Sequence, residues 1–177
     1  MEIDGRRLSN ADVSGMQQSL DMQSANFTTS FNYKDVATVS YTYYALRQLP
    51  YSVLMDITVT AKKDFSLGSA SVMEAPDALK DVQNYYNEID RPHVVISLLT
   101  SSAKSPTGKL LMCASNTFLF SEKHGEEPRV IHEMWDNNMH LMKFAKKIKA
   151  GETYRFSIAG ASITSAHHDD PLNEAER

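Results

Sequence analysis

Alternation of apolar and polar residues dominates residues 35–63 and predicts a long β-hairpin. In residues 53–61 five apolar side chains occupy every second position, and residues 37–45 repeat the pattern. Successive side chains of a strand point to opposite faces of a sheet, so each strand gains one apolar face. Pro50 lies between the two and cannot donate to a ladder, which places the bend there. Each buried Val, Ile or Met stabilises by roughly 1.5–3 kcal/mol, so these faces need a second layer to cover them.

Further strands are expected on both sides of this hairpin, separated by short polar turns. The expected strands lie within residues 19–33, 64–73, 93–101, 109–120 and 153–164. Phe65, Leu67 and Val72 are the inward candidates of the second of these. The runs around the turn at 105–108 predict another hairpin.

Two segments depart from this simple pattern. Residues 129–148 fit a helix or a strand, and the turn at 149–152 favours a strand that pairs with residues 153–164. After Pro76, apolar residues recur at three- and four-residue spacing, which predicts a short helical excursion around residues 76–89. Eight or more strands with short turns predict an all-β, two-sheet antiparallel sandwich of supersandwich-like form.

Composition fits one globular domain and argues against several classes of protein. The chain has 177 residues and a net charge of −4, without a basic stripe, which argues against a nucleic-acid partner. The apolar runs are too short for a membrane span, and the polar start shows no signal peptide, so the compartment stays open. The single cysteine, Cys113, lies in an apolar run and is expected in the core.

The residues with catalytic or metal-binding character do not form a convincing motif. Glu126 and Glu127 are neighbours, and neighbouring side chains of an extended segment point apart, whereas a glycosidase acid and base must converge on one bond. Residues 167–170 read His-His-Asp-Asp, but four consecutive ligands do not easily converge on one ion. We therefore predict no catalytic residue, metal site or cofactor in this chain.

Three aromatic residues are candidates for binding. Trp135, the only tryptophan, is flanked by polar residues and is a candidate for stacking on a sugar ring. Tyr85 and Tyr86 lie beside Asn84 and Asn87, a composition that suits a carbohydrate edge or an interface to another domain. Packing within the sandwich is the alternative for all three.

The order of several short signatures resembles the amino-terminal β-sandwich of glycoside hydrolase family 65, which contains maltose, trehalose and kojibiose phosphorylases and related hydrolases. In this chain the matching pieces are Ile3-Asp4-Gly5, Leu20-Asp21-Met22, the long hairpin, Lys149-Ala150-Gly151-Glu152 and Ser165 followed by Asp169, Asp170, Pro171 and Ala175. The stretch 44–47 departs from the Arg-Phe pattern of the family, which leaves the branch of the family open.

The resemblance implies a domain organisation and a role. Residues 1–165 would be the sandwich, and residues 166–177 the start of a linker to an (α/α)6 barrel that carries the catalytic acid. The chain would be a non-catalytic domain of an α-glucoside hydrolase or phosphorylase, inactive by itself. Its partners would be the barrel, an α-glucoside through the intact enzyme, and a second copy if the sandwich contributes to a homodimer.

Two other functions compete with this one. A stand-alone carbohydrate-binding sandwich would carry its own aromatic surface and sugar affinity. A purely structural adhesion module would have neither.

Overall fold

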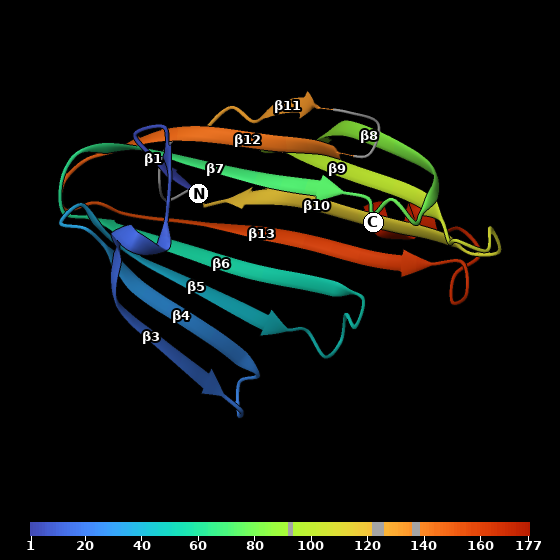
Figure 1. Ribbon diagram of the computed structural model, residues 1–177, viewed down its shortest axis with the longest axis horizontal. Helices are drawn as coiled ribbons and strands as arrows, with labels where there is room; N and C mark the ends of the chain where they lie inside the picture. Colours follow the sequence, from blue (N-terminus) through green and yellow to red (C-terminus); the bar gives the residue numbers. More distant parts are fainter. Residues whose placement is uncertain (92–93, 122–125, 136–138) are drawn as a thin grey trace.

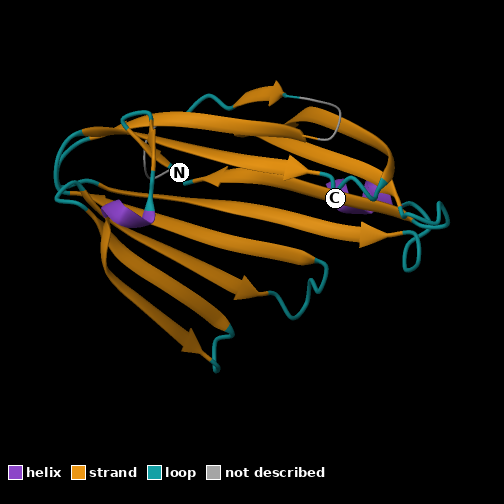
Figure 2. Cartoon of the chain, in the orientation of Figure 1, coloured by secondary structure: helices purple, strands orange, loops and turns teal. Residues whose placement is uncertain are grey.

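The computed structural model describes residues 1–91, 94–121, 126–135 and 139–177, and most of them lie in β-strands. Figures 1 and 2 show two antiparallel sheets, a broad one and a smaller one, as the sequence predicted. Within the described residues the broad sheet has eight strands, which in spatial order are β3 (Val13–Asp21), β4 (Asn26–Tyr33), β5 (Ala37–Ala45), β6 (Ser52–Ala61), β13 (Thr153–Thr164), β10 (Leu111–Phe120), β9 (Val94–Lys104) and β8 (Lys80–Arg91).

The smaller sheet is built around two long strands and extended by a short amino-terminal hairpin. Asp4 and Gly5 form the turn of that hairpin, and both have positive φ (50° and 74°), which suits the twist of a two-residue turn. In spatial order the described strands are β11 (Ile131–Met134), β12 (Met139–Ile148), β7 (Phe65–Glu74), β1 (Glu2–Ile3) and β2 (Arg6–Arg7).

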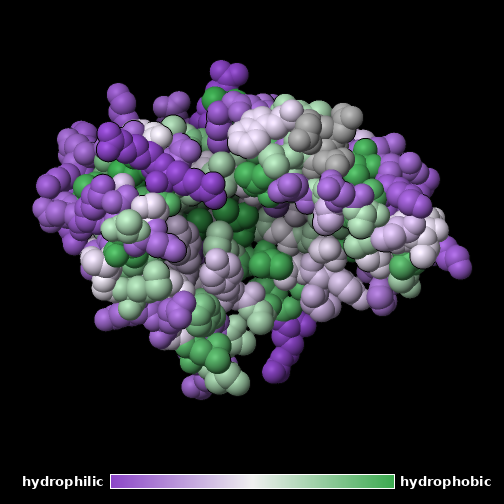
Figure 3. Space-filling view, viewed as in Figure 1, coloured by the Kyte–Doolittle hydropathy of each residue, from purple (hydrophilic) through white to green (hydrophobic). Residues whose placement is uncertain are grey.

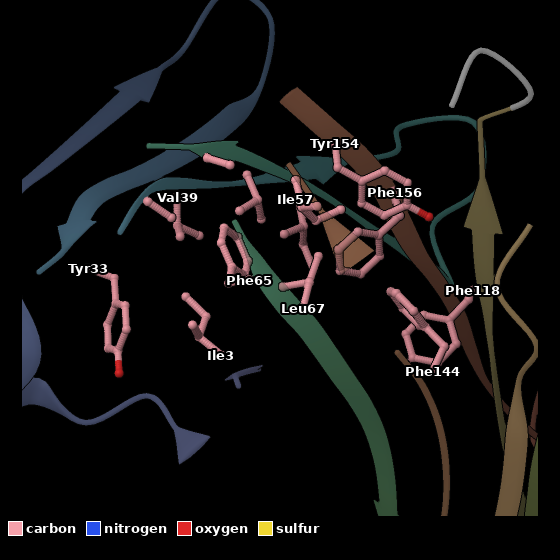
Figure 4. Close-up of a cluster of buried hydrophobic side chains, with 14 of the residues drawn as sticks. Ile3, Tyr33, Val39, Ile57, Phe65, Leu67, Phe118, Phe144, Tyr154 and Phe156 are labelled. Atoms are coloured by element: carbon pink, nitrogen blue, oxygen red, sulfur yellow. The ribbon is translucent and has the colours of Figure 1, made fainter. Parts of the chain in front are cut away.

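The core lies between the two sheets. Val39, Ile57 and Val59 of the predicted hairpin are at most 2% exposed, and they meet Leu67 of the smaller sheet in one cluster (Figure 4). The hairpin itself is confirmed, because β5 and β6 pair in unbroken register from Ala37–Ala61 to Ala45–Val53. The smaller sheet therefore supplies the second layer that covers the apolar face of the hairpin.

The predicted helical excursion around residues 76–89 is wrong, because β8 occupies most of this segment. β8 pairs with β9 across the whole strand, apart from a register shift between Lys80 and Gln83. The inward positions of this edge strand include Asn84 and Glu88, so the apolar residues do not alternate at period two. The apolar residues of β8 are divided between its two faces, which produced the helix-like spacing in the sequence. Hydrogen bonds to β9 satisfy the backbone groups that a helix would have paired internally.

Two details of the other strands also need correction. Residues 139–148 do form a strand, but β12 pairs with β7 and β11 rather than with β13. The turn at 149–152 therefore carries the chain from one sheet to the other. In β7, Phe65 and Leu67 are buried as predicted, whereas Val72 is 50% exposed because it lies on the opposite face of the strand.

The carboxyl-terminal residues fold back onto the broad sheet. The short helix α1 (Pro171–Glu176) is capped by Asp170, whose side chain accepts from the Asn173 amide at 3.2 Å. Its Ala175 is 5% exposed against Cys113 and Ile163, on the face turned away from the smaller sheet. The linker predicted for residues 166–177 thus includes a packed helix, while the domain boundary remains a prediction. Within the described residues no helix is long and apolar enough to cross a membrane.

Candidate functional site

The three predicted binding residues lie in different surroundings and do not converge. Trp135 follows β11 and is 64% exposed, with its indole N–H donating to Glu133 at 3.4 Å. Tyr85 points to the face of β8 that carries Asn87, whose amide reaches Glu176 of α1 at 3.4 Å. Tyr86 is the next residue along and points to the opposite face. A shared aromatic platform therefore does not form, and the binding role of each residue remains a prediction.

Tyr86 lies at the edge of the sandwich, where the two sheets meet. Its ring stacks on His132 of β11 with centroids 4.6 Å apart and planes within 2°. Its hydroxyl donates to Glu88 at 3.0 Å and lies 3.2 Å from the Ser97 hydroxyl. A pocket of about 460 Å³ opens beside this group. The sequence did not single out Glu88, Ser97 and His132. Residues 76–89 were predicted to be helical, and in a helix Tyr86 and Glu88 would not share a face, whereas in a strand they do.

A buried histidine lies next to this edge. His140 of β12 is fully buried, and its Nε2 is 2.8 Å from the Ser101 hydroxyl, which donates to Asn84 at 2.7 Å. The serine proton goes to Asn84, so Nε2 of the neutral ring must carry the proton that it shares with Ser101. Burial, together with nearby His132, lowers the pKa of His140 to about 4. A neutral ring sealed from solvent supports packing and is poorly placed for acid–base catalysis.

The pKa shifts of the described carboxyl groups bear on whether one of them could act as a catalytic acid. Such an acid must hold its proton near neutral pH, which requires a raised pKa. Burial tends to raise the pKa of Asp56, but hydrogen bonds from Ser157 and Arg155 overcome this and lower it. Among the described residues, the carboxyl groups whose pKa clearly departs from its ordinary value are all lowered, and they are Asp12, Asp21, Asp35, Asp56, Asp81 and Glu133.

Three residues of the His-His-Asp-Asp motif have structural contacts. The rings of His167 and His168 lie 6.0 and 5.4 Å from the ring of Tyr51, and Asp170 caps α1. No group of three or more His, Cys, Asp or Glu side chains in the described part of the chain is arranged to hold a metal ion.

A second candidate surface is the part of the broad sheet that the smaller sheet leaves uncovered. Burial on the inner face fades along the strands: Val59 is fully buried, whereas Val53 of the same face is 58% exposed. Tyr43 and Leu20 continue this face at 44% and 63% exposure. Figure 3 shows hydrophobic residues gathered in a hollow over β6 and β13 and at the free ends of β3 and β4. We call this surface, formed by Leu20, Phe27, Tyr43, Val53 and Met55, the uncovered face.

Comparison with known proteins identifies relatives that are much longer than this chain. It is 64% identical over 165 residues to kojibiose hydrolase of Mucilaginibacter mallensis, a match covering 93% of this chain and 24% of that protein. It is 44% identical over 177 residues to kojibiose hydrolase of Flavobacterium johnsoniae, covering 100% of this chain and 26% of that protein. The chain thus spans about a quarter of the curated relatives that it matches. A search of family models gave no match.

A solved structure shares the fold. A human-microbiome protein assigned as a kojibiose phosphorylase superposes with a TM-score of 0.64 over 93% of this chain and 22% of that chain, at 9% identity. Kojibiose phosphorylases are among the members of family 65. The resemblance inferred from the order of the sequence signatures is confirmed by the two kojibiose hydrolases, and the superposition confirms the fold alone.

Proposed function

We propose that this chain is the non-catalytic amino-terminal β-sandwich domain of an α-glucoside-processing enzyme of the kojibiose hydrolase type. The observation that carries the proposal is the 64% identity across almost the whole chain to one quarter of such an enzyme. We place the general acid and the second group that glycosidic cleavage requires in the other three quarters of such an enzyme. The sandwich then supports a catalytic domain that this sequence does not contain.

The purified 177-residue chain is expected to show no turnover of kojibiose, maltose or trehalose, with or without inorganic phosphate. The reason is that hydrolysis and phosphorolysis both need a proton donor poised at the glycosidic oxygen. Glucose release can be measured with a coupled assay, using the M. mallensis kojibiose hydrolase as the positive control. Turnover by a homogeneous preparation, lost on replacing one of its own carboxylates, would refute the non-catalytic role.

The uncovered face is the surface through which this domain is proposed to contact the rest of the enzyme. Soluble proteins rarely leave large apolar patches open to water, and such patches often mark interfaces. The face continues the core directly, since Val53 and Val59 lie on the same side of one strand. A partner that covers Leu20, Tyr43 and Val53 would complete the second layer over the free ends of β3 to β6.

Val53→Lys is expected to separate the stability of the domain from its docking. In the isolated chain it should change the free energy of unfolding by less than about 0.5 kcal/mol, because the side chain is already exposed. In a chimera that carries this chain in place of the matching quarter of M. mallensis kojibiose hydrolase, a buried lysine should lower the melting temperature and the activity. Thr60→Lys, on the opposite face of β6, is the matched control. Equal effects of the two substitutions in the chimera would exclude docking through the uncovered face.

A further inference from the structure

The pocket beside Tyr86 is formed where the outermost strands of the two sheets approach each other. Its walls come from β8, β9 and the end of β10 in the broad sheet and from residues 127–132, which lead into β11 of the smaller one. The volume of about 460 Å³ falls within the 300–1,000 Å³ range that is usual for small-molecule sites. Because both sheets contribute, the pocket depends on the whole sandwich and is not the hollow of one loop.

Polar groups of several kinds converge on this pocket. Glu88 and Arg129 are exposed, whereas Ser97 is 8% exposed and shares the Tyr86 hydroxyl with Glu88. Glu127 adds a second carboxylate. Carboxylates accept hydrogen bonds, a guanidinium donates them, and hydroxyls do both. This set therefore matches a ligand whose polar groups are hydroxyls, each of which can donate and accept a hydrogen bond.

Apolar and aromatic groups occupy the remaining walls. Val95, Phe120 and Ile131 line the pocket together with the stacked rings of Tyr86 and His132. His132 Nε2 is itself buried and has no hydrogen-bond partner among the described residues. Apolar and aromatic side chains beside convergent polar groups suit a molecule with hydroxyls around its edge and C–H groups on its faces.

We propose that this pocket binds one pyranose ring of a neutral sugar. Two carboxylates face one guanidinium, so the net charge of the pocket disfavours phosphate and other anions. The absence of a described three-ligand cluster gives no support to a metal ion in these walls. Trp135 is not part of the pocket, so the proposed site differs from the tryptophan-centred surface that the sequence suggested.

Titration of the ¹⁵N-labelled 177-residue chain with glucose and with kojibiose tests this proposal. We expect saturable amide shifts, at millimolar sugar, confined to β8, β9, the end of β10 at Phe120, and residues 126–135. Arg129→Ala should weaken binding about tenfold, because it removes a charged hydrogen-bond donor. Arg129 is exposed, so thermal unfolding should stay unchanged and show that the loss is not a folding defect.

The neighbouring tyrosines supply a matched pair of variants. Tyr86→Phe removes the hydroxyl that orders Glu88 and Ser97, and is expected to weaken sugar binding, whereas Tyr85→Phe removes a hydroxyl on the other face and should not. Absence of saturable shifts, shifts centred on Trp135, or equal affinity in all three variants would overturn the proposal. Inorganic phosphate is titrated in parallel, and a response to phosphate without a response to sugar would overturn the assignment of the ligand.

Discussion

Phe156→Ala is expected to lower the free energy of unfolding by about 3–5 kcal/mol, the usual cost of truncating a buried aromatic ring. Phe156 is 1% exposed and lies in the first half of β13, the strand that joins the two halves of the broad sheet. Its ring contacts those of Phe118 and Phe144 at centroid distances of 6.2 and 4.9 Å, with Phe144 reaching across from the smaller sheet (Figure 4). Truncation therefore opens a cavity at the point where both sheets meet.

The cavity should not collapse easily, because strands on every side are held by backbone ladders. β13 pairs with β6 at nine positions on one side and with β10 at nine positions on the other, so its backbone cannot shift toward the gap without breaking hydrogen bonds. Edge-to-face packing between Phe156 and Phe144 is also lost, which adds to the transfer term. These two effects place the expected cost in the upper part of the usual range for core substitutions.

Urea unfolding followed by circular dichroism measures this loss, and Trp135→Ala serves as the control. Trp135 is also aromatic but is 64% exposed, so its truncation should cost less than about 0.5 kcal/mol. A result of comparable size for the two substitutions would mean that the aromatic cluster does not hold the sheets together. An unchanged m-value would show that the denatured state is the same in both variants.

The long hairpin could be predicted from the sequence because its strands satisfy one rule throughout. Residues 37–45 and 53–61 carry an apolar or aromatic residue at every second position, and the structure pairs them without a bulge. The alternation does not show which part of an apolar face is covered. Val59 and Val53 are equivalent in the pattern, yet one is fully buried and the other 58% exposed, since coverage depends on the length of the second sheet.

The pocket could not be predicted because its strands break that rule. Asn84, Tyr86 and Glu88 share the inward face of β8, and a polar inward face gives no period-two signal. Its other wall begins at residue 127, about forty positions further along the chain. His132 lies against Tyr86 because its strand, β11, pairs with β12, and β12 pairs with β7 in the smaller sheet. The turn at 149–152 had instead predicted that β12 pairs with β13.

The buried histidine gives the fold a dependence on pH with a definite sign. The pKa of His140 is about 4 in the folded chain, against an ordinary value of 6.5, mainly because burial disfavours the charged ring. Between these two values the unfolded chain takes up a proton that the folded chain does not. The contribution of His140 to the free energy of unfolding is therefore fully present above about pH 6.5 and is lost as the pH falls toward 4.

The size of this loss follows from the difference between the two pKa values. At about 1.4 kcal/mol per unit, a fall from 6.5 to about 4 costs on the order of 3 kcal/mol. Carboxylates with lowered pKa values, such as that of Asp56, also lose their hydrogen bonds in acid, but mostly below this window. Protonation would also place a cation beside His132, whose ring centroid is 5.8 Å away.

His140→Gln isolates the contribution of the histidine, because glutamine can still donate to Ser101 but does not titrate. We expect the wild-type chain to lose more stability than the variant between pH 7 and pH 4.5, as measured by urea unfolding at each pH. The substitution itself changes the free energy of unfolding at pH 7. The comparison therefore uses the slope of the free energy of unfolding against pH in each protein and not its absolute value. Parallel curves would mean that His140 keeps an ordinary pKa, and a His140 side-chain NMR titration with its midpoint near 6.5 would establish the same point directly.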